Sequence, residues 1–418
     1  MKLTKEQQQA IDILNSGKNV FLTGEAGTGK STIINQFVGR TTKRNILTFA
    51  PTGIAALQVG GVTIHRGFKI ERGVLPPTKF LFVPQEIEVA DVIIIDEISM
   101  CRVDMFDRVV EIIMKANETR RRFKQDPIQL VLVGDFFQLP PVTTDVEKQA
   151  LRHLYPNLKE YFAFNSKYWK QLDFQNIVLK EIMRQDDDNF IHALNDIRKG
   201  KRQAIDFLNN NASHKESDSA VTLTGINKVA TQINQDKLKE LSSLPVRVRT
   251  KIKGKVNPSD LCVDEELLLK EGARIMTIVN GSGYQNGTLG YIVKIDQKKK
   301  QLKVLLDNGE YALIKKNTWE VYGYSTITRN DGEKMVVRET IGTYEQFPVK
   351  LAYEITIHKS QGQTFSEMNL YPYSWDHGQL YVALSRVSSL KGLHLMESIK
   401  YNFLKTSNEV VDFYSKLK

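Results

Sequence analysis

Short runs of apolar residues recur along the chain, separated by mixed segments long enough to form helices. Most of these runs are apolar at consecutive rather than alternate positions, a pattern typical of parallel strands that helices cover on both faces. We predict strands at residues 20–22, 46–50, 92–95, 130–133, 177–179, 221–224, 351–357 and 368–371. Their alternation with helices predicts two doubly wound α/β domains with parallel sheets.

The alternation of strands and helices stops after about residue 236. The turn dipeptides Asn286-Gly287 and Asn308-Gly309 lie here among β-rich runs at residues 274–279, 288–295, 302–306 and 311–314. Asn-Gly turns join the two strands of antiparallel hairpins. We therefore predict a small antiparallel β-barrel that is inserted into the second α/β domain. The predicted domains are a first α/β domain at 1–175 with a proline-rich insertion at about 65–85, a second at 176–235 plus 347–418, and the barrel at 236–346.

The chain carries 58 Lys and Arg against 48 Asp and Glu, a formal net charge of +10. This balance favours a polyanionic partner, most commonly nucleic acid, although charge that serves only solubility is the alternative. The two cysteines, Cys101 and Cys262, form no CxxC pair, which argues against a zinc site and suits a reducing compartment. No run is long enough to span a membrane and the N-terminus has no apolar signal core. We therefore expect a cytoplasmic, bacterial or phage-like protein, or a nuclear one in a eukaryote.

Residues 24–32 read G-E-A-G-T-G-K-S-T, between the predicted strand 20–22 and a segment that can continue as a helix. This is the phosphate-loop pattern in its strand–loop–helix context. The glycines let backbone N–H groups turn onto phosphate oxygens, Lys30 reaches the β- and γ-phosphates, and Ser31 offers a hydroxyl to Mg²⁺. A glycine-rich loop with a chance Lys-Ser is the alternative. The expected nucleotide-binding residues are Gly24, Ala26, Gly27, Thr28, Gly29, Lys30, Ser31 and Thr32.

Two further predicted strands end in polar residues. Asp96 and Glu97 follow residues 92–95. In a phosphate-loop enzyme the first acid holds Mg²⁺ and the second orients the attacking water or accepts its proton; two solvated acids are the alternative. The segment G-D-F-F-Q follows residues 130–133, and its Gln138 can sense the γ-phosphate. Phe136 and Phe137 are candidates either for stacking on bases or for the core.

Arg184 and Arg386 can supply positive charge from the second α/β domain. An arginine that reaches across a cleft between domains stabilises charge on the transferring phosphoryl group. A surface ion pair is the ordinary alternative for a lone arginine, but two α/β domains with one phosphate loop favour a shared site. The guanine-reading motif N-K-x-D is absent, because Asn227-Lys228 precede Val229-Ala230.

Several other polar residues have two interpretations. Thr4 and Gln7 form a T-x-x-Q pattern, which predicts a helix capping box, while a Gln amide can also pair with both edge atoms of adenine. The residues alone favour the cap. Thr52, His65 and His358 each follow an apolar strand and can donate to phosphate oxygens, or can be satisfied within their loops.

The motifs follow one another over nearly the whole chain. They are Glu6-Gln7, G-E-A-G-T-G-K-S-T (24–32), A-P-T-G-I-A-A (50–56), G-G-V-T-I-H (60–65), D-E-I-S-M (96–100), G-D-F-F-Q-L-P-P-V (134–142), M-R-Q (183–185), H-K-S-Q-G-Q-T-F (358–365) and Y-V-A-L-S-R-V (381–387). With these motifs the chain resembles DNA helicases of superfamily one, in the Pif/RecD-like branch. The Pif type in particular is indicated by the pair D-E-I-S-M and G-D-F-F-Q-L-P-P-V, and by the stretch 101–116, which is similar to the signature region of that group.

The resemblance implies two RecA-like domains and an ATP-driven motor that moves 5′ to 3′ on single-stranded DNA and unwinds duplex DNA. It implies an adenine contact for Gln7, against the preference from the residues alone. It places Gln138, Arg184, Gly362 and Arg386 around the γ-phosphate. The DNA-contacting residues that it implies are Thr52, Thr63, His65, Thr356, His358, Lys359 and Ser360.

The expected partners are ATP with Mg²⁺, single-stranded DNA and tailed or forked duplex DNA, with a monomer in the free state and no membrane. An RNA or RNA–DNA hybrid helicase with the same motor stays open as an alternative, because only the 2′-OH separates the substrates. An ATP-gated nucleic-acid-binding switch that never unwinds is a second alternative.

Three features lie outside the motifs. The insertion after His65 carries Phe68, Phe80 and Phe82, and we predict that it contacts DNA as the wedge that parts the duplex. Arg120-Arg121-Arg122 follow a predicted helix at 103–115, where cations suit the C-terminal dipole. Alternate positions further on are basic, so on a strand they would share one DNA-binding face, with an exposed loop as the alternative; they are Arg247, Arg249, Lys251, Lys253 and Lys255.

Overall fold

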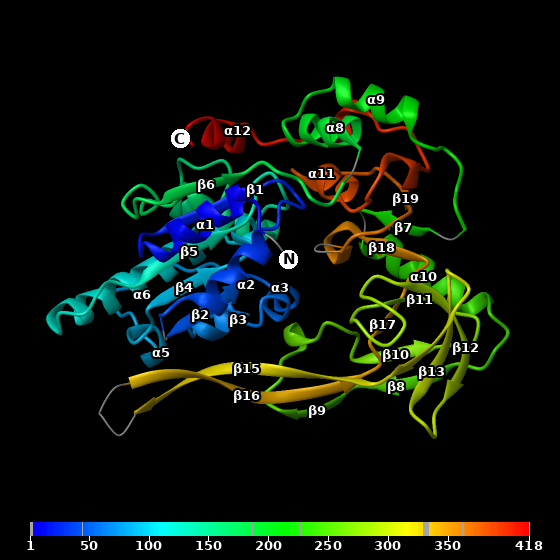
Figure 1. Ribbon diagram of the computed structural model, residues 1–418, viewed down its shortest axis with the longest axis horizontal. Coiled ribbons are helices and arrows are strands. Elements are labelled where there is room, and N and C mark those ends of the chain that lie inside the picture. Colours follow the sequence, from blue (N-terminus) through cyan, green and yellow to red (C-terminus); the bar gives the residue numbers. More distant parts are fainter. Residues whose placement is uncertain are drawn as a thin grey trace. The chain divides into compact units, whose positions relative to one another are not determined.

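The computed structural model describes residues 3–43, 45–185, 187–218, 220–225, 227–328, 334–360 and 363–417 (Figure 1). The chain divides into two compact units. Unit 1 comprises Met1–Met183, Tyr322–Ile341 and Ser407–Lys418, and unit 2 comprises Arg184–Val321 and Gly342–Thr406. In the described ranges, no helix combines the length and the apolar character that crossing a membrane requires.

Unit 1 is built on a six-stranded parallel sheet. In the order of pairing, its strands are β3 (Val62–Thr63), β2 (Ile46–Ala50), β4 (Val92–Ile95), β5 (Gln129–Val133), β1 (Val20–Gly24) and β6 (Gln175–Leu179). Its helices are α1 (Lys5–Asn15), α2 (Lys30–Arg40), α3 (Gly53–Gln58), α4 (Ile64–Gly67), α5 (Gln85–Glu88), α6 (Val103–Arg122), α7 (Asp145–Leu154) and α12 (Asn408–Ser415).

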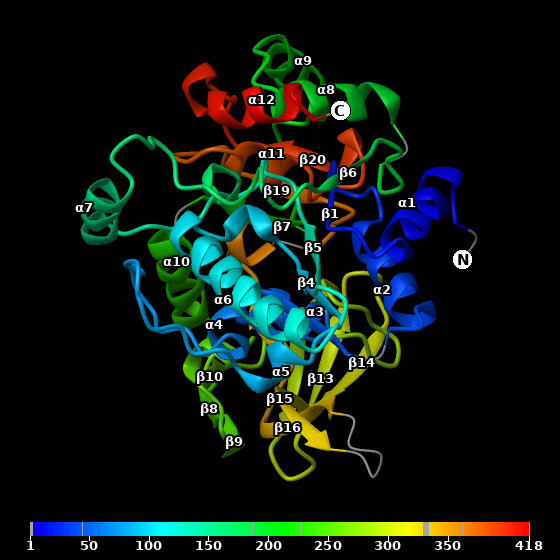
Figure 2. The same cartoon turned by 90° about the vertical axis from the view of Figure 1, so that its left-hand side faces the viewer.

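The consecutive apolar residues of these strands belong to two hydrophobic clusters. On β4, Val92 and Ile94 belong to one cluster, with residues of α1 and α2, while Ile93 and Ile95 belong to the other, with residues of α6. Side chains alternate between the two faces of a strand, so a strand covered on both faces is apolar at nearly all of its positions. Figure 2 shows α6 lying across one face of this sheet.

The helix α6 continues about two turns further than the sequence predicted, to Arg122. The three arginines therefore form its last turn rather than follow it. Arg120 is buried, donates to the carbonyl oxygens of Asp126 and Glu88, and lies 3.5 Å from an Asp91 carboxylate oxygen. These contacts and the helix C-terminus account for the basic run without a ligand.

Unit 2 contains a four-stranded parallel sheet and most of an antiparallel region, from which Tyr322–Ile341 belongs to unit 1. The parallel strands, in pairing order, are β18 (Glu354–Thr356), β7 (Val221–Thr224), β19 (Met368–Leu370) and β20 (Leu393–Leu395). Its helices are α8 (Asp188–Arg198), α9 (Gln203–Asn211), α10 (Asn227–Glu240) and α11 (Gln379–Leu384). The run predicted as one strand at 351–357 is divided between β18 and β17 (Val349–Leu351), which joins an antiparallel sheet.

The antiparallel region consists of three sheets. One pairs β14 (Tyr311–Lys315), β13 (Gln301–Leu306), β12 (Leu289–Asp296), β11 (Arg274–Thr277) and β17. The others pair β10 (Glu266–Leu269) with β8 (Val246–Arg249), and β15 (Asn317–Thr328) with β16 (Lys334–Gln346) and β9 (Lys251–Gly254). Gly287 and Gly309 have φ of 91° and 83°, the left-handed values that Asn-Gly turns require. The fold class is confirmed as two parallel α/β sheets with an antiparallel insertion, whose closure into a barrel stays a prediction.

Three segments belong to unit 1 although the predicted boundaries placed them elsewhere. The strand β6 pairs with β1 along its whole length. Within Tyr322–Ile341, the hydroxyl of Tyr324 accepts from Thr48 N at 3.0 Å. In α12, the ring of Phe413 stacks on Phe164 with centroids 4.4 Å apart. These contacts join residues far apart in sequence, so the pattern along the chain could not place them, and the structure moves the boundaries accordingly.

Candidate nucleotide site and nucleic-acid interface

The phosphate loop connects β1 to α2, which begins at Lys30. Gly27 and Gly29 adopt left-handed backbone conformations, with φ of 85° and 83°. The Lys30 ammonium donates to the carbonyl oxygens of Gly24 (2.8 Å) and Glu25 (2.9 Å), which holds it over its own loop. A bound phosphate would offer the ammonium a charged acceptor in place of these neutral carbonyls.

The acidic pair follows β4. Glu97 is a non-glycine residue in the left-handed region, with φ 51° and ψ 44°, and its N–H donates to Asp96 Oδ1 at 2.8 Å. Strained backbone of this kind persists where the surroundings fix it and is concentrated at functional sites. Gly134, after β5, packs so closely that a Cβ there would lie 3.0 Å from Ile98 N. The carboxyl ends of β4 and β5 therefore meet as the sequence predicted.

Ser31 and Asp96 form a donor set that fits Mg²⁺. The Ser31 hydroxyl is exposed in the first turn of α2. Burial raises the pKa of Asp96, while the Glu97 N–H and the positive charge of Lys30 lower it. A divalent cation would favour the ionised carboxylate in the same way. Hydroxyl, carboxylate, water and phosphate oxygens are the ligands that Mg²⁺ prefers.

Gln7 and Gln138 flank this region of unit 1. The predicted capping box is present: Thr4 Oγ1 accepts from Gln7 N, and Gln7 Oε1 accepts from Thr4 N, both at 3.2 Å. The same Gln7 amide lies against the phosphate loop, because a Cβ on Gly29 would be 2.7 Å from Gln7 Nε2. Gln138 is largely buried, and its N–H donates to the Asp135 carbonyl oxygen at 2.9 Å.

Arg184 and Arg386 converge on Ser385 within unit 2. Arg184 Nη1 donates to the Ser385 carbonyl oxygen at 3.4 Å, and Arg386 Nη2 donates to Ser385 Oγ at 2.8 Å. Arg386 is almost fully buried, and its Nε also donates to the Val382 carbonyl oxygen. Burial lowers the pKa of Arg184. The structure thus brings the two predicted arginines together, while Gly362 lies outside the described residues.

Two of the predicted DNA contacts cap helices. Thr52 Oγ1 accepts from Ala55 N at the start of α3, and Thr63 Oγ1 accepts from Arg66 N at the start of α4. Both residues remain half exposed, so capping and a contact with DNA are compatible. Burial lowers the pKa of His65, and so do the nearby charges of Arg72 and Arg102. At neutral pH His65 is therefore a neutral hydrogen-bond donor rather than a cation.

Two predicted DNA-contacting phenylalanines lie in the core instead. Phe136 is 1% exposed and packs in an aromatic cluster with Phe21 and Phe413, at centroid distances of 5.5 Å. Phe68 is also 1% exposed and lies 4.9 Å from Phe49. The prediction that these rings stack on DNA is wrong, because the aromatic core of unit 1 encloses both.

Two hydroxyls of unit 2 are also buried. Thr356 is 1% exposed, and its hydroxyl has no hydrogen-bond partner among the residues that the structure describes. Ser360 is fully buried and donates to the Ile357 carbonyl oxygen at 2.8 Å. Neither hydroxyl can reach a DNA backbone from this position, so the predicted direct contacts are wrong as the structure places them. The side chains of His358 and Lys359 lie outside the described residues.

The five alternating cations do not form one continuous strand. Thr250 separates β8 from β9, and the two strands pair in different sheets. Glu266 accepts from Arg247 at 2.8 Å and from Arg249 at 3.2 Å. All five cations are exposed, but an acidic neighbour already pairs with the first two. The strongest remaining phosphate-binding candidates are therefore Lys251, Lys253 and Lys255.

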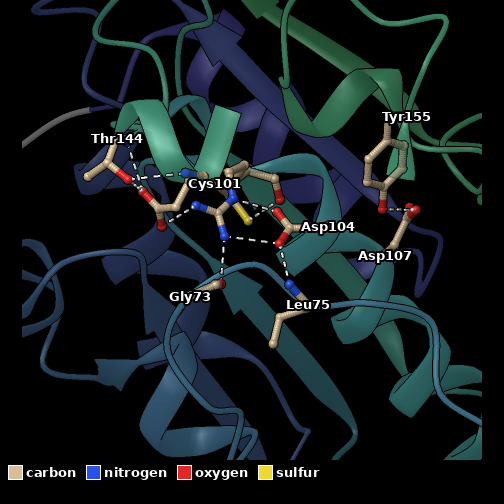
Figure 3. Close-up of polar contacts among 9 residues, drawn as sticks. Gly73, Leu75, Cys101, Asp104, Asp107, Thr144 and Tyr155 are labelled. Atoms are coloured by element: carbon tan, nitrogen blue, oxygen red, sulfur yellow. Dashed lines mark hydrogen bonds and ion pairs between the residues drawn. The ribbon is translucent and has the colours of Figure 1, made fainter. Parts of the chain in front are cut away.

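One buried arginine that the sequence patterns did not single out holds the insertion after His65. Arg102 Nη2 donates to the Gly73 carbonyl oxygen at 2.6 Å, and Arg102 Nε donates to Asp104 Oδ1, also at 2.6 Å. Asp104 Oδ2 accepts from Leu75 N at 2.8 Å. The remaining nitrogen of the same guanidinium, Nη1, donates to Glu147 of α7. Figure 3 shows this network around Gly73, Leu75 and Asp104, at the start of α6.

The anchored insertion exposes two aromatic side chains. Phe80 is 91% exposed and Phe82 is 64% exposed, in contrast to the buried Phe68. The ammonium of Lys69 lies 5.5 Å from the centre of the Phe82 ring. Exposed rings can stack on nucleic-acid bases, so these two side chains keep the wedge a prediction. The sequence had marked both phenylalanines, but the anchoring role of Arg102 could not be recognised from its neighbours alone.

The phosphate loop after β1, the acidic pair after β4 and a second parallel sheet define a P-loop NTPase with two RecA-like domains. The family model described as PIF1-like helicase matches residues 2–207. The ATP-dependent DNA helicase Pif1 of Campylobacter jejuni is 31% identical over 441 residues, covering 95% of this chain and 94% of that protein. This chain belongs to the PIF1-like helicase family.

Solved structures agree with this membership. Bacteroides sp Pif1 in complex with ADP-AlF4 has a TM-score of 0.84 and 33% identity, with 99% of this chain and 97% of that chain covered. Bacteroides Pif1 bound to single-stranded DNA has a TM-score of 0.68 and 34% identity over the same shares. A zebrafish (Danio rerio) relative, ATP-dependent DNA helicase PIF1, is 32% identical over 444 residues, covering 100% of this chain and 64% of that protein.

Proposed function

We propose that this chain, an ATP-dependent DNA helicase, moves 5′ to 3′ along single-stranded DNA as a monomer and unwinds the duplex ahead of it. The observation that carries the proposal is the arrangement in unit 1 of Lys30, the strained Glu97 and the Gln138 loop around the end of one parallel sheet. Relatives support the substrate, because Bacteroides Pif1 has been solved with single-stranded DNA and with ADP-AlF3 plus single-stranded DNA.

In the proposed mechanism, the phosphate loop binds ATP through its backbone N–H groups while Lys30 moves from its carbonyl partners to the phosphates. Gln7, beside Gly29, contacts the adenine edge. Glu97 orients the attacking water and takes its proton, and Gln138 senses the γ-phosphate. Ser31 and Asp96 would hold Mg²⁺, which neutralises charge on the phosphates when bound.

Arg184 and Arg386 are proposed to complete the site from unit 2. Their shared position on Ser385 would let one movement bring both guanidiniums toward the γ-phosphate. Each unit need only change its relative affinity for DNA between nucleotide states for hydrolysis to produce steps along the strand. The proposed DNA contacts are Thr52, Thr63, His65, His358, Lys359 and the exposed lysines Lys251, Lys253 and Lys255.

The direction of movement is tested with two duplexes that differ only in their tail. We expect strand separation with ATP on the duplex with a 5′ single-stranded tail and little on the duplex with a 3′ tail. Preference for the 3′ tail would reverse the proposed polarity. Separation of a tailed RNA duplex at the same rate would favour the RNA helicase, and ATP turnover without any strand separation would favour the nucleotide-gated switch.

The wedge proposal predicts a separation of two activities. Replacing exposed Phe80 and Phe82 with Ala should lower unwinding of a forked duplex by about tenfold, because aromatic stacking contributes about 1–3 kcal/mol per base. ATP turnover stimulated by single-stranded DNA should stay within about twofold, since the network at Arg102 and Asp104 is untouched. Phe123→Ala, at a 73% exposed site in the same unit, is the matched control. Equal loss of both activities would argue against a wedge.

A further inference from the structure

Tyr414, in the C-terminal helix α12, contacts two segments of the nucleotide site. Its hydroxyl lies 2.6 Å from Thr23 Oγ1, on β1 directly before the phosphate loop. The same hydroxyl accepts from Phe136 N at 3.1 Å and donates to Asp135 Oδ1 at 3.2 Å, in the loop that ends at Gln138. One oxygen atom therefore bridges the strand that enters the phosphate loop and the segment that carries the proposed γ-phosphate sensor.

The hydrogen bonds of this bridge are mutually consistent. A tyrosine hydroxyl has one hydrogen to donate and can accept two. With that hydrogen given to Asp135, the hydroxyl accepts from Phe136 N and from the Thr23 hydroxyl. Asp135 is fully buried, so each of these bonds is shielded from competing water.

The rings of this region hold the hydroxyl in place. The Tyr414 ring lies on Phe137 with centroids 4.7 Å apart. The preceding residue, Phe413, packs against Phe136 and Trp169 of the aromatic cluster. The helix α12 is itself fixed at its start, where Ser407 caps Val410 N and Asn165 donates to Glu409. The position of the hydroxyl is thus determined by packing and does not depend on the bridge itself.

We infer that Tyr414 is a positioning residue for ATP hydrolysis, which sets the Gln138 loop relative to the phosphate loop. The Gln138 N–H is bonded to the Asp135 carbonyl oxygen, so a shift of Asp135 moves the sensor with it. The inference rests on the proposed role of Gln138. It assigns to α12, which lies outside the residues matched by the family model, an influence on the chemical step that acts through Gln138.

The test is a double-mutant cycle on DNA-stimulated ATP turnover. Tyr414→Phe removes the hydroxyl and with it all three hydrogen bonds of the bridge. It should lower kcat by at least about twofold, the factor that the loss of even one such bond implies, with the KM for ATP within about twofold. In the Gln138→Ala background, Tyr414→Phe should cause no further loss, because the residue through which it acts is gone. A purely structural role would lower activity by the same factor in both backgrounds and would overturn the inference.

Two further variants keep the test decisive. Tyr401→Phe is the matched control, since it removes a tyrosine–carboxylate hydrogen bond to Asp206 of 2.6 Å in unit 2 and should leave kcat unchanged. Thr23→Val removes the other side of the bridge at nearly constant volume, and it carries the test if Tyr414→Phe does not fold. Its loss of kcat should also vanish in the Gln138→Ala background.

The outcomes separate this inference from the assignment on which it rests. If Gln138→Ala leaves ATP turnover unchanged, the proposed sensor is wrong and the inference falls with it. If Gln138→Ala lowers turnover while Tyr414→Phe and Thr23→Val do not, the sensor stands and the positioning role of Tyr414 alone is overturned.

Discussion

Glu97→Gln is expected to lower DNA-stimulated ATP turnover by about 10²- to 10⁴-fold, the contribution typical of a general base. The substitution keeps the size of the side chain and removes its ability to take a proton. Its backbone lies in the left-handed region, with φ 51°, which Gln tolerates no better or worse than Glu. The measurement is steady-state ATP turnover with saturating single-stranded DNA.

Binding should survive this change. Glu97 follows β4 in unit 1 and makes no part of the proposed DNA surface, so the affinity for a single-stranded oligonucleotide should stay within about threefold. Lys30→Ala should also abolish turnover, but by weakening the hold on the phosphates that replace its carbonyl partners. Glu118→Gln, at an exposed position of α6, is the control for removing an acid from the same unit. ATP turnover that persists in Glu97→Gln would contradict the assignment.

The parallel strands could be predicted because their environment determines their composition. Residues 46–50 and 92–95 coincide with β2 and β4, since strands buried on both faces are almost entirely apolar, and Thr48 is the one polar residue in these two. The carboxyl ends of parallel strands lie at the same edge of the sheet. Asp96, Glu97 and the segment up to Gln138 follow such ends, which is why they could be predicted to belong to one site.

The aromatic and hydroxyl residues could not be assigned in the same way. Phe136 comes shortly after β5, in a polar segment where it could be expected to contact a ligand. An aromatic cluster that includes Phe413, far along the chain, encloses it instead. Thr52 and Thr63 read as phosphate donors, but each also caps a short helix. Burial by a distant segment leaves no local trace in the sequence, so residue type and neighbours predict the position of acids and glycines better than the burial of rings and hydroxyls.

The partners of several arginines could not be predicted from the sequence for the same reason. In the sequence, Arg247 and Arg249 belong to a run of alternating cations with no acid beside them. In the structure, β10 pairs with β8 and brings Glu266 within hydrogen-bond distance of both. Arg102 follows the motif D-E-I-S-M, and nothing in its neighbours marks it as structural. Its guanidinium nevertheless donates hydrogen bonds to the insertion, to α6 and to α7. Antiparallel pairing and loop anchoring depend on contacts between residues distant in sequence, which alternation and spacing do not report.

Arg184→Ala is expected to lower DNA-stimulated ATP turnover by about 10³-fold or more, the range of an arginine that stabilises a transferring phosphoryl group. Arg184 is a sharper probe than Arg386. Arg386 is 2% exposed and donates to Val382 and Ser385, so its removal would also leave buried acceptors unpaired. Arg184 makes one long contact of 3.4 Å to the Ser385 carbonyl oxygen and is only partly buried.

Arg184→Lys adds a test of mechanism, because it keeps a positive charge but loses the planar fork that can engage two phosphate oxygens. We expect it to recover only a small part of the lost turnover, with ATP binding nearly unchanged in both variants, since the phosphate loop belongs to unit 1. Arg202→Ala, an exposed arginine of unit 2 beside Tyr401, is the control for loss of a cation. Turnover within about threefold of the unaltered protein in Arg184→Ala, with an unchanged melting temperature, would remove Arg184 from the site and leave hydrolysis to the residues of unit 1 and Arg386.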